Sequence, residues 1–116
     1  MAQGPQSEKE REKQLREGIE KQIERYEDLL KLEDWQVFYA DSVLTANYTG
    51  MQDELKAMSE SKVSNSDLYT MAVDKWQEKT YQAFRKFLTD EQWAKYLKTG
   101  AAREKKDRDK RAEKRK

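Results

Sequence analysis

The sequence predicts an extended, all-α protein in which three to four long amphipathic helices form an antiparallel helical hairpin. Four glycines and one proline in 116 residues are too few for a turn-rich sandwich or barrel. Leu, Ile, Val and Phe supply only 18 residues, below the one in five typical of a conventional core. Apolar residues recur at steps of three and four, the helical period. We therefore expect one thin domain over residues 7–100, without a thick interior.

The first helix is predicted over residues 7–31, after a disordered segment at 1–6. Ser7 and Glu10 have the Ser-x-x-Glu spacing of a capping box, which marks a helix start. The apolar positions form one narrow stripe, consisting of Leu15, Ile19, Ile23, Tyr26 and Leu30. A stripe this narrow packs along a single seam, either within the chain or as a coiled coil with a partner.

The second and third helices are predicted over residues 34–61 and 64–88, with the turn between them in Lys62–Asp67. Gly50 lies inside the second helix, where it indicates a bend or a close contact with another helix. Ser64, with Asp67 three residues later, is the predicted N-cap of the third helix.

A fourth helix is predicted over residues 90–98, ending at Thr99 and Gly100. The tail that follows, residues 101–116, carries nine basic and four acidic residues and is predicted to be helical or frayed. Its favoured interpretation is a solvated extension with Glu104–Arg108 and Asp107–Arg111 pairs at i,i+4. The alternatives are an electrostatic hook for acidic clients or lipid headgroups, and a nucleic-acid contact.

Missing residue types exclude most enzyme chemistry. Without cysteine or histidine there is no disulfide, thiolate site, imidazole base or imidazole metal ligand. The four glycines are too scattered for a phosphate-binding loop. We therefore predict no enzyme, no cofactor and no metal site. No apolar run is long enough for a membrane span, and Met1 is interpreted as an expression methionine on a mature N-terminus.

A repeated boundary sequence separates the predicted helices. In Leu88-Thr89-Asp90-Glu91-Gln92, Thr89 is the expected N-cap, Gln92 closes the capping box, and Leu88 is placed to contact the following tryptophan. Leu32-Glu33-Asp34-Trp35-Gln36 has the same spacing. Glutamate is a poorer N-cap than threonine, which leaves the break between the first two helices weakly specified.

The two segments resemble the paired Leu-Thr-x-x-Gln motifs of the Spy/CpxP family of small periplasmic helical proteins. The second motif matches in full, and the first departs at Glu33. The resemblance covers about residues 29–100. It implies an ATP-independent chaperone or envelope-stress protein, an antiparallel homodimer that holds unfolded clients on a concave face. Some family members bind metals, but a chain without histidine or cysteine gives no reason to expect this here. The motif residues with an implied structural role are Leu32, Gln36, Leu88, Thr89 and Gln92.

Ten large side chains are candidates for contact with a client or with a second copy. A helical layer this thin cannot cover both sides of its aromatic residues, so some are exposed or covered by another chain. Aromatic and methionine side chains also suit the binding of varied apolar segments. The alternative for each is an ordinary place in the core. The candidates are Trp35, Phe38, Tyr39, Met51, Met58, Trp76, Tyr81, Phe84, Trp93 and Tyr96.

Two functional hypotheses follow. The first is a periplasmic, chaperone-like homodimer that binds unfolded or partly folded proteins, with no nucleic acid expected. The second is a structural helical adaptor that binds one defined protein through a coiled-coil seam. General suppression of aggregation without nucleotide distinguishes the first from the second.

Overall fold

The computed structural model describes residues 7–116, and these residues form helices without any strand. The all-α class is therefore confirmed, while the disorder predicted for residues 1–6 lies outside the described residues. None of the helices in the described chain combines the length and the apolar character needed to cross a membrane. The elements are α1 (Glu8–Leu30), α2 (Asp34–Glu60), α3 (Ser66–Phe87), α4 (Asp90–Tyr96), η1 (Leu97–Ala101) and α5 (Ala102–Lys114).

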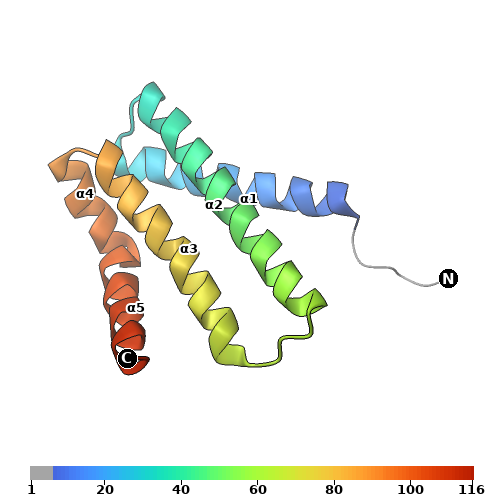
Figure 1. The fold of residues 1–116 in the computed structure, drawn as a ribbon. Helices are drawn as coiled ribbons and strands as arrows, with labels where there is room; N and C mark the ends of the chain where they lie inside the picture. The colour runs from blue at the N-terminus through green and yellow to red at the C-terminus, as the bar shows by residue number, and fades with distance from the viewer. Residues whose placement is uncertain (1–6) are drawn as a thin grey trace.

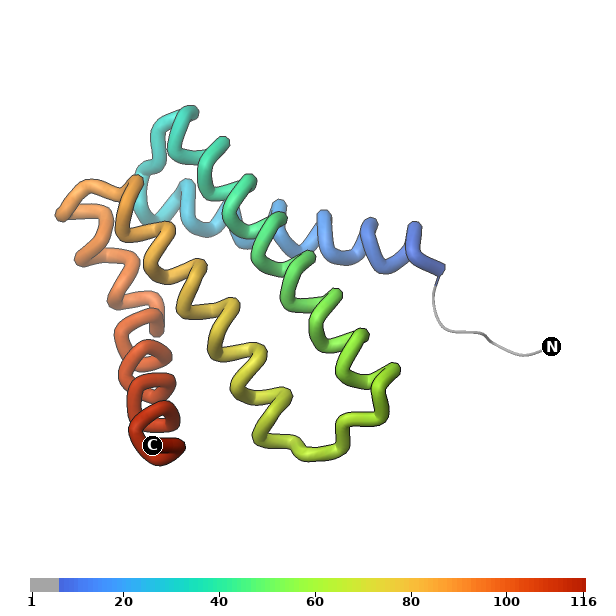
Figure 2. The backbone as a smooth tube through the Cα atoms, viewed as in Figure 1, coloured from blue at the N-terminus to red at the C-terminus, as the bar shows by residue number. Residues whose placement is uncertain are grey.

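The helices form a thin assembly. α2 and α3 make an antiparallel hairpin, α5 returns beside α3, and α1 crosses behind the hairpin (Figure 1). Figure 2 traces the backbone from the α2–α3 turn through α3 to the C-terminal arm, which comprises α4, η1 and α5. No loops cross along this path. Principal extents of 50 × 40 × 17 Å agree with the expected extended shape.

The helix starts follow local capping chemistry, with one correction. Ser7 Oγ accepts a hydrogen bond from Glu10 N at 3.2 Å, as predicted. The N-cap of α3 is Asn65 rather than Ser64, because the Asn65 side chain accepts from the Asp67 amide at 2.9 Å. The predicted boundary was therefore wrong by one residue.

The junction between α1 and α2 is a clean break, contrary to the weak break expected at Glu33. α1 ends at Leu30, and Lys31 takes the left-handed conformation, φ 54° and ψ 55°. This conformation closes the last turn of a helix and turns the chain away from its axis. The break is thus made by the C-terminal end of α1 as much as by the N-cap of α2.

The core lies where α1, α2, α3 and the C-terminal arm meet. The α1 stripe faces this core, with Ile19, Ile23 and Leu30 buried, so the narrow seam is used within the chain. Phe84 and Tyr96 are buried in the core with ring centroids 5.1 Å apart. Their selection as client or dimer contacts was therefore wrong, because neighbouring rings from three helices cover them.

Gly50 marks a close contact rather than a bend. α2 continues through it, and the Cβ atom of any other residue at this position would lie 2.5 Å from Trp76 Cη2. The Trp76 ring on α3 therefore packs against the bare backbone of α2. This contact sets how closely the two arms of the hairpin approach.

The C-terminal segment departs most from expectation. Gly100 breaks the helix close to its predicted end: its φ of 107° and ψ of −11° are non-helical and kink the chain within η1, and a helix resumes at once as α5. α5 lies against α3, and neither predicted i,i+4 pair forms: Arg108 pairs with Glu78 and Arg111 with Asp74. These carboxylates lie on α3, out of reach of local spacing, although Lys105 also pairs with Asp109 at i,i+4 inside the tail.

Candidate functional site

The two motif segments, 56 residues apart, meet at one end of the fold, where the α1–α2 and α3–α4 junctions lie close together (Figure 1). Leu32 and Leu88 are both buried there. The Gln36 Nε2 donates a hydrogen bond to Gln92 Oε1 at 2.6 Å, and Gln92 Nε2 donates back to Gln36 Oε1 at 3.0 Å. We call this reciprocal pair of amides the glutamine clasp.

Each glutamine of the clasp also caps its own helix. Gln36 Oε1 accepts from the Glu33 amide at 2.9 Å, and Gln92 Oε1 accepts from the Thr89 amide at 3.0 Å. Thr89 completes its box by accepting from the Gln92 amide. These bonds satisfy backbone donors that a helix start would otherwise leave unpaired.

The clasp then reaches the ends of the opposite helices. Gln36 Nε2 donates to Phe87 O at 3.0 Å, at the end of α3. Gln92 Nε2 donates to Leu30 O at 3.2 Å, at the end of α1. Gln36 is 0% exposed, and a buried amide is tolerated only when such partners are present. The geometry assigns these residues a joining role, and Gln36 has no surface left for a ligand.

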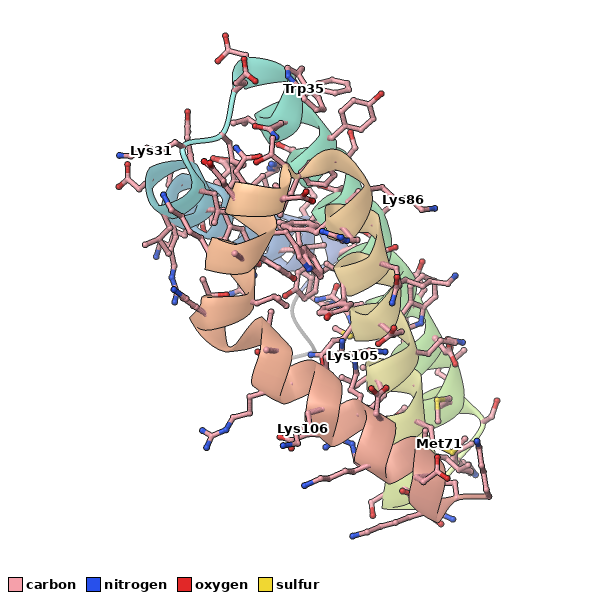
Figure 3. All side chains as sticks on the ribbon, turned by 90° about the vertical axis from the view of Figure 1, so that its left-hand side faces the viewer. Lys31, Trp35, Met71, Lys86, Lys105 and Lys106 are labelled. Atoms are coloured by element: carbon pink, nitrogen blue, oxygen red, sulfur yellow. The ribbon has the colours of Figure 1, made fainter. Side chains whose placement is uncertain are left out.

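Three of the ten predicted contact residues form an exposed patch. Trp35, Phe38 and Tyr39 are 49%, 69% and 52% exposed on the first turns of α2. Tyr39 lies edge-on to both neighbours, with ring centroids 6.0 Å from Trp35 and 6.2 Å from Phe38. We call these three residues the aromatic patch; Figure 3 shows Trp35 at one end of the molecule.

Five other predicted residues are half-buried between helices: Met51, Met58, Trp76, Tyr81 and Trp93. Trp76 is held in place because its Nε1 donates to Glu54 Oε1 at 2.8 Å and Lys79 Nζ lies 4.4 Å from its ring. Tyr81 packs edge-on to Trp93 at 4.9 Å. These rings mainly join elements of the chain.

The structure shows exposed apolar residues outside the ten candidates. Leu68 and Met71 are exposed at the start of α3, and in Figure 3 Met71 lies at the opposite end from Trp35. An open groove of about 530 Å³ runs between α1 and α2, bordered by Leu15, Gly18 and Tyr48. The available signal was Gly18, whose missing side chain leaves space on a helix of otherwise long residues.

Ion pairs fix how α1 crosses α2. Arg16 binds Asp41 with both terminal nitrogens, at 3.0 and 2.6 Å. Hydrogen bonds from Arg16, with a further one from Thr45, hold the pKa of Asp41 below its ordinary value of 3.8 despite partial burial. The pKa of Glu54 is lowered in the same way by Lys75 and Trp76, which joins α2 to α3.

Comparisons add no relative to this description. No family model, curated protein or solved structure matches the chain. Within residues 7–116, no three acidic side chains gather closely enough to hold a metal ion. The resemblance to the Spy/CpxP family therefore rests on the two motif sequences.

Proposed function

We propose that this protein is an ATP-independent, chaperone-like or envelope-stress protein of the periplasm, which binds unfolded or partly folded polypeptides as a homodimer. The observation that carries the proposal is the aromatic patch. Three adjacent aromatic side chains stand about half exposed or more on a chain in which 41% of residues are charged.

The patch contributes little to the stability of the monomer. Burial of apolar surface is favourable by about 25 cal/mol per Å², and these side chains leave much of that free energy unrealised. Contiguous exposed apolar surface of this kind is typical of binding sites. Tryptophan, phenylalanine and tyrosine accept many apolar partners.

The envelope assignment depends on the paired motifs. Their implied role is structural, and the glutamine clasp is consistent with that role because its bonds join helix ends. Client contact then falls to exposed side chains elsewhere, above all Trp35, Phe38 and Tyr39. The open groove between α1 and α2 offers a second apolar surface for the same clients.

Light scattering of a reduced, aggregating model protein tests the proposal, with no nucleotide present. We expect suppression at near-equimolar ratios, weakened by Phe38→Ser, because Phe38 is the most exposed aromatic. Leu29→Ser is the matched control, since Leu29 is also exposed but lies outside the patch. Absence of suppression at several-fold excess contradicts the proposal. Sedimentation equilibrium tests the homodimer separately.

A further inference from the structure

α5 is held to the protein without an apolar anchor. Between Ala102 and Lys114 the only apolar side chains are two alanines, Ala102 and Ala112, and both are exposed. The hydrophobic effect, which fixes most helices of globular proteins, therefore contributes little to its docking.

Charge takes the place of apolar contact along the α3–α5 boundary. Lys105 Nζ lies 2.8 Å from Glu78 Oε2, and Arg111 Nε lies 2.8 Å from Asp74 Oδ2. The carboxylates stand on one face of α3, and the cations form a matching antiparallel row on α5. The remaining pairs are Arg108–Glu78, Arg115–Asp67 and Arg115–Asp74. Lys105 lies at the border of α5 with α3 in Figure 3.

Arg108 occupies the centre of this boundary with incomplete bonding. Its side chain is 6% exposed and its guanidinium lies 5.5 Å from the Tyr81 ring. Nη2 is buried and has no hydrogen-bond partner in the described chain, although Glu78 Oε1 is 3.2 Å away. A buried charge with an unmade bond weakens the docked state.

α5 forms one wall of a half-open cavity. The cavity has a volume of about 180 Å³ and lies where α1, α2, α3, η1 and α5 meet, and its lining is more polar than apolar. Glu104 and Arg108 line it from α5, opposite the rings of Tyr26, Tyr81 and Tyr96. A cavity of roughly 150 Å³ is large enough for a benzene ring.

The connection to the rest of the chain is suited to movement. Gly100 has φ 107°, a conformation that glycine adopts without strain, and it stands between α4 and α5 inside η1. A change of torsion at this one residue moves α5 as a unit.

We propose that α5 is a charge-held, hinged wall that partly covers this cavity, and that its release at Gly100 opens the cavity fully to a neutral, ring-bearing ligand with a hydrogen-bonding group. The inference does not depend on the proposed chaperone function. Ionic strength and loss of the α3 carboxylates are the probes of this cover, because salt weakens the more exposed ion pairs and leaves apolar packing intact.

Hydrogen exchange of the full chain tests the release. In 0.5 M NaCl we expect α5 amides to exchange severalfold faster, because salt screens the more exposed of the five ion pairs, while α2 and α3 amides keep their protection. D74N/E78Q should show the fast exchange already at low salt. E24Q/D28N is the control, since it removes two exposed carboxylates from α1. Equal α5 protection in both variants, or loss of protection in every helix, overturns the proposal.

Indole, a neutral probe that fits the cavity, tests the opening. We expect saturable amide chemical-shift changes at Thr80, Thr99 and Ala101, with severalfold tighter binding to D74N/E78Q than to the unchanged protein or to E24Q/D28N at low salt. Equal affinity in all three proteins shows that α5 does not cover the cavity, and absence of binding in all three shows that the cavity takes no such ligand. Either result overturns the proposal.

Discussion

At the scale of single residues, the glutamine clasp places more hydrogen bonds on two side chains than any other part of the described structure. Gln36 and Gln92 bond to each other, to their own N-cap amides and to the carbonyls of Leu30 and Phe87. An apolar residue at either position would leave several buried polar groups unpaired. A single substitution in the pair should therefore cost more stability than the loss of its buried surface alone.

We predict that Gln36→Met lowers the free energy of unfolding by about 3 kcal/mol, because near-isosteric methionine keeps the volume and removes the bonds. The double variant Q36M/Q92M should lose less than the sum of the two single variants, since neither amide then faces an unpaired partner. Urea denaturation measures both. Gln14→Met, on the exposed side of α1, is the control and should change little.

Alanine substitutions at Gly50 and Gly18 should change the free energy of unfolding in opposite directions. Gly50→Ala would place its methyl group 2.5 Å from the Trp76 ring, which is fixed by its bond to Glu54, so we expect a loss of about 1–3 kcal/mol. Gly18 has no atom within 4 Å of the same position, so Gly18→Ala should gain about 0.5–1 kcal/mol through helix propensity. Urea midpoints test both; a gain at Gly50 would contradict the close contact.

At the scale of elements, ion pairs orient helices that apolar stripes alone leave free to rotate. Arg16–Asp41 fixes the crossing of α1 over α2, and Lys75–Glu54 joins α2 to α3. Because the folded pKa of Asp41 lies below its ordinary 3.8, its carboxylate stabilises the fold above that pH. As the pH falls through the folded pKa, the unfolded chain has already taken up the proton, and this contribution is lost.

Asp41→Asn should therefore flatten the loss of stability between about pH 5 and pH 2, because the variant has no proton to bind at this position. Thermal unfolding across that range measures the slope. Asp28→Asn, which changes an exposed carboxylate on α1, serves as the matched control and should keep the steep acid limb. An unchanged slope in Asp41→Asn would show that the Arg16 contact does not persist in solution.

Periodicity and capping predicted the elements well because both are local. Ser7 and Thr89 act as N-caps at the expected positions. The docking of α5 could not be predicted, because the partners of Arg108 and Arg111 lie 30 and 37 residues away. The same limit applied to the ten contact candidates: a stripe shows which side chains face other helices, but Phe84 and Phe38 differ only in what packs over them.

At the scale of the whole molecule, the 24 basic and 23 acidic residues nearly cancel in net charge, and several of them pair across helix boundaries. The exposed apolar side chains at the two ends of the molecule stand among these charges, so a bound polypeptide would meet both kinds of contact. Their contributions have opposite salt dependence, because salt screens charges and strengthens apolar burial.

We therefore expect 0.5 M NaCl to reduce, but not abolish, suppression of aggregation by the unchanged protein. The suppression that remains should be more sensitive to Phe38→Ser than the suppression at low salt, because the apolar share is larger once charges are screened. Scattering curves for both proteins at the two salt concentrations test this. Complete loss in salt for the unchanged protein would place all client binding in the charged surface.

Distance along the chain makes the glutamine clasp a late event in folding. The clasp joins residues 56 and 62 positions apart, whereas the α2–α3 hairpin closes through a short turn. Long loops close at greater entropic cost, so the hairpin should be in place when the two amides meet. Interactions formed after the transition state govern the unfolding rate more than the folding rate. The clasp would then act chiefly on how long each folded molecule lasts, and little on how quickly it forms.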